Sequence, residues 1–422
     1  MDIKISSNID SVVLITIDSL RYDRIGYYNY DNFVQTPTID TLASKGIIFT
    51  NSISHGGGTP EAFPSLLCSV PPPYSLEDRN VWKYKTIAQY LKESGFTCAA
   101  FHSNPYLTRI FGYNKGFDFF FEGDTNVFMK NNYFMALNIL FRNKAPITNA
   151  KQLTDKCIKW LKNAKKPFFL WIHYMDAHFP YLPPVDVSGV ALSLKGRILW
   201  PFLMSIKIQR KCYKSPPKFK ETLIKLYNKA IISIDREINN LLRELQKVSK
   251  KPLIILTADH GEAFWEHFTF GHSSVYDEII RIPLIIYIKG LKGRIEYQVG
   301  SSGILPTILE ILGIDLGSNT KLYGHNLLTV QEDYPIISVS LDPPFGTRAI
   351  SYRTPSWKYI RIEKLNGKLL REELFLLNKD PLEKINQINY RRDLADEAIE
   401  AINKWRIRSL VRYRIRNIKN IK

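Results

Sequence analysis

Cysteine is scarce in this sequence, and long apolar runs are missing. The four cysteines, Cys68, Cys98, Cys157 and Cys212, are spread widely over 422 residues, and none belongs to a CxxC pair. This spacing argues against a disulfide framework and against a zinc knuckle. No apolar run approaches the roughly 20 residues that cross a bilayer, and Met1–Ser6 does not begin a secretory signal. We therefore expect a cytoplasmic protein, with peripheral membrane contact left open.

Basic residues outnumber acidic residues in this chain. Asp and Glu total 40 against 58 Lys and Arg, which gives a formal net charge of +18. This excess favours anionic partners, but no nucleic-acid motif accompanies it, so we do not expect nucleic-acid binding. Two basic, partly apolar segments, 193–214 and 405–422, suit contact with an anionic membrane. The first also suits a lid over a site, and a basic helix exposed to solvent is the plain alternative for both.

The order of predicted elements indicates the fold class. Apolar residues make up 45% of the chain, which is ordinary for a folded globular protein. Strands alternate with helices as far as residue 312, which predicts an α/β fold with a mainly parallel sheet covered by helices on both faces. Short strands without intervening helices then predict a small antiparallel α+β subdomain. We divide the chain into a large domain, 1–330, this subdomain, 331–400, and a basic helical tail, 401–422.

Acidic side chains stand at the ends of two predicted strands. The apolar run 252–256 leads to Asp259 and His260, and the run 11–17 leads to Asp18. Ligands bind at the carboxyl ends of strands in such sheets, and carboxylate oxygen with imidazole nitrogen suits a divalent cation. Asp18 alone would more often be a helix N-cap. Two such strand ends in one sheet favour a metal site.

Further polar residues follow other predicted strands. The strand at 167–172 is followed by two histidines, His173 and His178, and one of them could be a buried core residue. Three glycines, Gly56–Gly58, precede Thr59 and a helix start. They suit close backbone approach and an anion cradle, with a flexible linker as the alternative.

Several short motifs occur in an order that is typical of one family. They are Val12–Asp23, Thr36–Gly46, Thr257–Glu262 with Gly271-His272 and Tyr276–Leu284 downstream, and Trp357–Ile360 with Glu373–Glu383. In these motifs the chain resembles the sulfatases, within the alkaline phosphatase superfamily, nearly from end to end. The resemblance implies an alkaline phosphatase-like fold.

The resemblance also implies a cofactor and site residues. Sulfatases hold a divalent cation, usually calcium, on carboxylates at strand ends; Mg²⁺, Mn²⁺ and Zn²⁺ stay open here. Asp18, Asp259 and His260 match its ligands, and Ser19 stands where many sulfatases have a second Asp. The remaining matches are His178, which resembles the family's substrate-anion or leaving-group histidine, and His272, which resembles its second downstream histidine; we predict that both are catalytic. Apart from the resemblance, we predict that Arg21 and His173 bind the substrate, whose negative charge basic groups can stabilise.

The nucleophile departs from the family pattern. Sulfatases read Cys/Ser-x-Pro-x-Arg, and aligning Phe63–Leu66 on this motif places Ala62 at the nucleophile and Leu66 at the arginine. A methyl group cannot attack an ester. Thr59 as a displaced nucleophile is our first choice, ahead of a metal-bound water and of binding without turnover.

The sequence therefore predicts a metal-dependent hydrolase of sulfuric or phosphoric esters, acting on a glycan or lipid headgroup. The alternative is a catalytically inactive sulfatase-like protein that binds such an anionic molecule, and Ala62 motivates it. Oligomeric state is not predicted.

Overall fold

The computed structural model describes residues 9–28, 34–73, 80–124, 148–179, 181, 217–316, 321–342 and 345–419. Every predicted site residue lies within these ranges. The basic segment 193–214, predicted as an interfacial helix or a lid, lies outside them. Among the described helices, none combines the length and the apolar character that crossing a membrane requires.

The centre of the molecule is a nine-stranded sheet built around β1 (Ser11–Ile17). Its neighbours β5 (Phe168–Tyr174) and β6 (Pro252–Ala258) are both parallel to it. The path of the sheet is β10-β2-β9-β6-β1-β5-β3-β4, with β11 paired to β2. The other strands are β2 (Ile47–Ile53), β3 (Thr97–His102), β4 (Phe119–Glu122), β9 (Arg281–Tyr287), β10 (Gly293–Ile295) and β11 (Val299–Gly300). Only β9 among these described strands runs against its neighbours β2 and β6.

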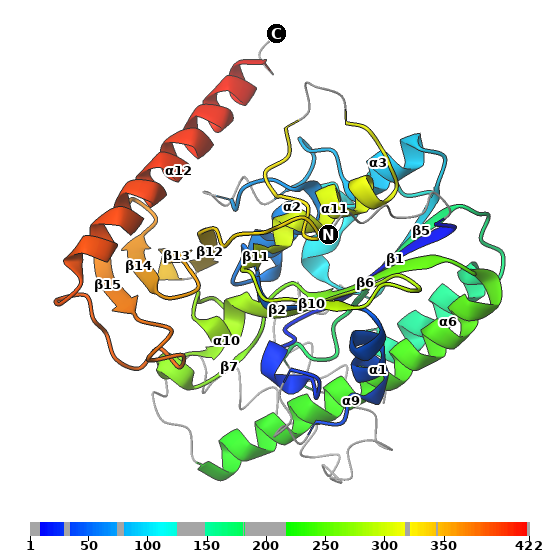
Figure 1. Cartoon of the computed structure of the whole chain (residues 1–422), viewed down its shortest axis with the longest axis horizontal. Helices are drawn as coiled ribbons and strands as arrows, with labels where there is room; N and C mark the ends of the chain where they lie inside the picture. Colours follow the sequence, from blue (N-terminus) through cyan, green and yellow to red (C-terminus); the bar gives the residue numbers. More distant parts are fainter. Residues whose placement is uncertain are drawn as a thin grey trace.

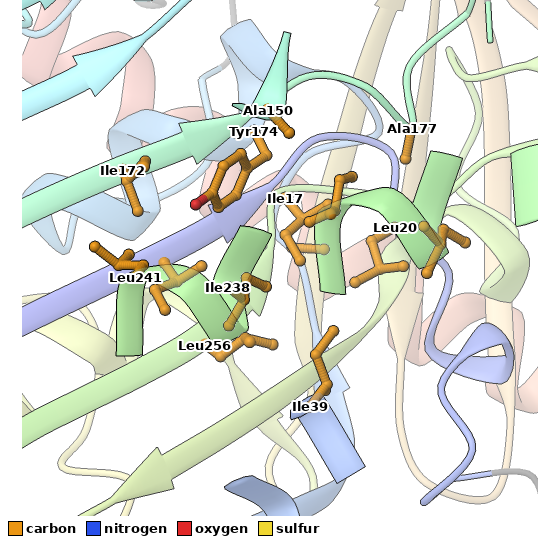
Figure 2. Packing of buried hydrophobic residues seen from close by; sticks show 14 of the residues in the cluster. Ile17, Leu20, Ile39, Ala150, Ile172, Tyr174, Ala177, Ile238, Leu241 and Leu256 are labelled. Carbon is orange, nitrogen blue, oxygen red and sulfur yellow. The ribbon is translucent and has the colours of Figure 1, made fainter. Parts of the chain in front are cut away.

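Both faces of the sheet are buried, as the apolar strand sequences require. In β1, Val13 and Ile15 face the helices α1 (Pro37–Lys45), α6 (Ala150–Leu161) and α9 (Pro217–Val248). Val12 and Leu14 face the opposite layer, made of α2 (Thr59–Cys68), α3 (Ile87–Glu93) and α11 (Ile304–Ile311). Figure 2 shows the first layer, where Ile238 and Leu241 of α9 pack near Ile17 and Leu256. The predicted α/β fold is confirmed (Figure 1).

Shorter elements follow β6 and shape one edge of the site. They are the hairpin of β7 (Ala263–Phe264) and β8 (Phe270–Gly271), with the 3₁₀ turn η5 (Glu266–Phe268) between them, and then α10 (Asp277–Ile280). Further 3₁₀ turns are η1 (Tyr22–Arg24), η3 (Pro105–Leu107), η4 (Arg109–Phe111) and η6 (Ser301–Gly303).

The predicted antiparallel subdomain is also confirmed. Its strands lie in chain order: β12 (Ile336–Asp342), β13 (Thr347–Arg353), β14 (Lys358–Lys364) and β15 (Leu369–Phe375). Helix α12 (Arg392–Lys419) packs on this sheet through Ala395, Ala398, Ile402 and Trp405 (Figure 1). The border predicted between residues 400 and 401 falls inside α12, and the domain division stays a prediction.

The small sheet also holds the loop that precedes α2. Gly57 N donates to Val339 O at 3.0 Å, and Val339 N donates to His55 O at 3.0 Å. The subdomain thus helps to fix the start of α2, which borders the site described next.

Candidate active site

Asp18 and Asp259 lie side by side because of the strand register. Ile17 of β1 pairs with Ala258 of β6, so the next residue of each parallel strand is a carboxylate at the same edge of the sheet. Neither side chain is exposed to solvent. The two predicted metal ligands therefore meet at the carboxyl ends of the central strands, where open α/β sheets bind their ligands.

His173 joins this pair from the other neighbour of β1. Its Nε2 lies 3.2 Å from Asp18 Oδ2, and its Nδ1 lies 2.9 Å from Thr16 Oγ1. Donor atoms of Asp18, His173 and Asp259 all lie within 4.8 Å of one another. The prediction placed His173 against the substrate, whereas the structure buries it completely among the carboxylates. Its position at the end of β5, next to β1, decides this difference.

His260, the third predicted ligand, faces the same two carboxylates. Its Nδ1 lies 2.9 Å from Gly261 O, an atom that can only accept, so the ring proton sits on Nδ1. Burial lowers the pKa of His260 and favours the neutral ring. The bare Nε2 then lies 3.6 Å from Asp18 Oδ1 and 3.5 Å from Asp259 Oδ2. It has no hydrogen-bond partner among the described residues.

This donor set fits a divalent cation. A lone pair on nitrogen and two carboxylates face one another, and a bound cation would relieve the repulsion between them. Burial and the charge of Asp18 raise the pKa of Asp259. Burial also opposes ionisation of Asp18, but His178, His173 and His260 outweigh it and lower the pKa of Asp18.

Thr59 brings a hydroxyl group to the carboxylates. It is the first residue of α2, and its Oγ1 lies 3.0 Å from Asp259 Oδ2 and 3.3 Å from Asp18 Oδ2. The preceding glycines are needed for close approach: a Cβ on Gly56 would lie 2.2 Å from Ala62 N, and one on Gly57 would lie 2.0 Å from Ser274 O. The run is therefore a packed loop and not a flexible linker.

The geometry changes the motif alignment around Ala62. Ala62 lies one turn further along α2 and is fully buried, whereas the side chain that reaches the carboxylates is that of Thr59. Placing Thr59 first in the five-residue motif puts Phe63 at the arginine position. The ring of Phe63 packs edge-on against the ring of His173, with the two ring centroids 5.1 Å apart. The inactive alternative, which Ala62 motivates, stays a prediction.

His178 and His272 lie on the open side of the cluster. Their ring centroids are 5.0 Å apart, and the His272 ring is 4.7 Å from that of His260. The side chain of His272 is 30% exposed, unlike the buried ligand residues, and its Nδ1 lies 3.7 Å from Glu262 Oε2. The structure therefore brings both predicted catalytic histidines to the edge of the cluster that solvent reaches.

Arg21 does not direct its charge into the cluster. Its guanidinium makes two hydrogen bonds to Asp23, at 2.8 Å each, and contacts Glu266 Oε1 at 3.0 Å and Glu262 O at 2.9 Å. Its side chain is only 8% exposed. These contacts hold the loop after β1, and the role of Arg21 in substrate binding stays a prediction.

Two residues outside the predicted set of site residues complete the cluster. Ser19, in a left-handed conformation (φ 58°), donates from its N to Asp259 Oδ1 at 3.3 Å and from its Oγ to Asp18 Oδ1 at 3.1 Å. Asn104, just after β3, donates from Nδ2 to Asp18 Oδ2 at 2.7 Å and to Thr59 Oγ1 at 3.2 Å. The sequence feature that could have indicated a role for Asn104 is its position just after another predicted strand.

Comparison with known proteins agrees with this geometry. The family model described as Sulfatase matches residues 10–314, which is most of the chain. The chain belongs to the sulfatase family. Arylsulfatase K of Mus musculus is 29% identical to it over 284 residues, covering 57% of this chain and 50% of that protein. Iduronate 2-sulfatase of Homo sapiens is 24% identical over 331 residues, covering 66% of this chain and 60% of that protein. The sulfatase chain thus spans about half the length of the first of these relatives.

Solved structures share the fold at low identity. A protein solved in complex with its substrate D-glucosamine-2-N,6-O-disulfate superposes with a TM-score of 0.70 at 16% identity, covering 95% of this chain and 98% of the other. The phosphonate monoester hydrolase of Agrobacterium radiobacter gives a TM-score of 0.69 at 16% identity, covering 95% and 96%. These two likenesses establish the alkaline phosphatase-like fold of this sulfatase.

Proposed function

We propose that this sulfatase is a metal-dependent hydrolase of sulfuric or phosphoric esters with Thr59 as its nucleophile. The observation that carries the proposal is the contact of Thr59 Oγ1 with Asp259 and Asp18, at 3.0 and 3.3 Å. A hydroxyl needs a neighbouring base or a cation to become a nucleophile. Thr59 has a buried carboxylate within hydrogen-bond distance, and Ala62 has no group that could react.

Asp18, Asp259 and His260 would hold the cation, with His173 as a further ligand beside Asp18. The resemblance to sulfatases implies calcium, while the two nitrogen donors also suit Zn²⁺ or Mn²⁺. When bound, the cation would neutralise the two carboxylates and draw electron density from an oxygen of the ester.

The protein's own groups account for the proton transfers. Thr59 would donate its proton to Asp259 Oδ2 as Oγ1 forms a bond to sulfur or phosphorus. The bond from that atom to the ester oxygen breaks, and His178 or His272 would protonate the departing alcohol from the open side. Water would then hydrolyse the ester formed on Thr59 and restore the hydroxyl.

The substrate class is proposed from the neighbours and from charge. One neighbour in fold binds a disulfated glucosamine and another is a phosphonate monoester hydrolase. We propose a sulfated or phosphorylated glycan or lipid headgroup for this chain. The net charge of +18 supports an anionic partner. A cytoplasmic location and peripheral contact with an anionic membrane stay predictions.

The deciding experiment compares turnover of an aryl sulfate, an aryl phosphate and an aryl phosphodiester by metal-loaded protein. Thr59→Ala should abolish turnover, by about 10⁵-fold when a nucleophile is removed, and Thr59→Ser should retain part of it. Thr41→Ala is the matched control, because Thr41 is exposed on α1 and its Oγ1 donates to Pro37 O. Turnover that persists in Thr59→Ala would instead favour direct attack by water, and the preferred ester would name the reaction.

A further inference from the structure

The side chain of Asn104 is held in one orientation inside the site. It is 1% exposed and caps the 3₁₀ turn η3, where its Oδ1 accepts a hydrogen bond from Tyr106 N at 2.8 Å. A backbone N–H can only donate, so the amide oxygen must be the atom that faces Tyr106. The amide nitrogen is therefore the group directed at the carboxylates.

Both hydrogens of this nitrogen have acceptors. Nδ2 lies 2.7 Å from Asp18 Oδ2 and 3.2 Å from Thr59 Oγ1. Thr59 Oγ1 in turn lies 3.0 Å from Asp259 Oδ2, which can only accept when ionised. The hydroxyl of Thr59 thus donates to one neighbour and accepts from another, and this leaves a single lone pair of Oγ1 for another atom.

We propose that Asn104 is a further catalytic residue, which orients the Thr59 hydroxyl and donates a hydrogen bond to Oγ1 while that oxygen loses its proton and attacks. The proposal rests on the proposed function, because it matters only if Thr59 is the nucleophile. Hydrogen-bond donors already in place where negative charge develops lower the barrier, since they need no reorganisation during the reaction. The amide carries no charge, so it can do this without repelling a cation held by Asp18.

Capping alone does not explain why this residue is asparagine. Aspartate caps helical turns as well as asparagine does, and it could accept the same hydrogen bond from Tyr106 N. Aspartate here would face Asp18 with a third carboxylate and would offer Thr59 no donor. The nitrogen atom is therefore the part of the side chain that the site uses.

Two variants separate the roles of this side chain. Asn104→Asp keeps the shape and the cap but removes both donors, and Asn104→Ala removes the side chain. In each, we expect kcat for the best aryl ester to fall by about 10²- to 10³-fold, the usual cost of losing such a donor, while KM changes by less than about threefold. Ser103→Ala is the control: Ser103 Oγ bonds to Thr148 O and lies next to Asn104 in sequence, and its kcat should be unchanged.

Metal content and thermal unfolding of each variant complete the experiment. A fall in kcat at normal metal content and folded fraction supports the role of Asn104. A kcat within twofold of the wild type in both variants overturns it, as does a loss of activity that merely follows lost metal or lost fold in both. If Thr59→Ala is inactive while the Asn104 variants are fully active, only this inference fails. If Thr59→Ala is fully active, the proposed nucleophile fails as well.

Discussion

Two buried aspartates, Asp259 in the site and Asp277 at the start of α10, show two ways of burying negative charge. Asp277 receives hydrogen bonds from Arg353 at 2.9 and 2.7 Å and from Lys358 at 2.7 Å. These cations outweigh the effect of burial and lower the pKa of Asp277. Asp259 instead faces another carboxylate, and burial together with Asp18 raises its pKa.

The difference in surroundings distinguishes an aspartate that stabilises the fold, Asp277, from one whose charge can bind a ligand, Asp259. Around Asp277 the chain supplies its own cations, from β13 and β14 of the small sheet, and the ion pairs join that sheet to the large domain. Around Asp259 the described neighbours are the carboxylate of Asp18, imidazole rings and hydroxyl groups. A folded protein keeps such repulsion where it serves a function, so the cluster at Asp259 is the place where an external cation is expected.

The largest expected effect comes from Asp259→Asn. The variant keeps the shape but removes the proton acceptor of Thr59 and one charge that holds the cation, so turnover should fall by about 10³-fold or more. In metal-free protein the same change should leave the unfolding temperature equal or higher, because a like-charge contact is gone. Steady-state kinetics and calorimetry measure the two effects. A strongly destabilised metal-free variant would contradict our account of Asp259.

Asp277→Asn should have the opposite pattern: it should lower the stability of the fold and leave metal binding unchanged. It removes the carboxylate that pairs with buried Arg353, while Lys358 keeps its ion pair with Glu383, and breaking such a buried pair costs about 3–5 kcal/mol of unfolding free energy. Urea unfolding measures this loss, and bound metal per folded chain should stay normal. If Asp277→Asn proved as stable as the wild type, the ion pairs at α10 would not stabilise the contact between α10 and the small sheet.

Removing the metal should have the next largest effect. A cation that binds only the folded state at about 100 times its Kd adds about 2.7 kcal/mol to the stability. A chelator should therefore lower the unfolding temperature of the wild type and of Asp277→Asn, and added Ca²⁺ should restore it. Asp259→Asn should respond weakly to either treatment. Equal responses in all three proteins would place the cation elsewhere.

The smallest effect concerns Glu278, next to Asp277. Burial, with Glu383 nearby, raises the pKa of Glu278 to about 8. The folded protein therefore holds a proton that the unfolded chain releases near pH 4.5, and the stability from this group is lost as pH rises toward 8. Glu278→Gln should remove this slope, so its gain in unfolding free energy over the wild type should be larger at pH 8 than at pH 5. Glu310→Gln, at an exposed position of α11, is the control, and urea unfolding at pH 5 and pH 8 measures both.

Much of the site followed from local pattern. Asp18 and Asp259 were predicted together because each follows an apolar, β-branched run. Such a run predicts a buried strand, and a residue that follows it lies at the carboxyl end of that strand. The histidines were harder. His173 was assigned to the substrate, since a strand end alone does not say which way its side chain turns. Asn104 received no role, because its contact with Thr59 depends on the order β1-β5-β3 and on how α2 begins.

The sequence by itself determined the fold class, the family and the segments that carry the acidic residues, because hydrophobic period and motif order are local properties of the chain. Thr59 was already the first choice as nucleophile from the sequence, but only the tertiary structure shows its hydroxyl in contact with the carboxylates. An alignment anchored on Pro64 chose Ala62, whereas the packed glycines at Gly56 and Gly57 bring the first residue of α2, Thr59, against Asp18 and Asp259. The tertiary structure decided likewise that Arg21 is committed to Asp23 and Glu266. Contacts between residues far apart in the chain depend on strand order and packing, which no local pattern contains.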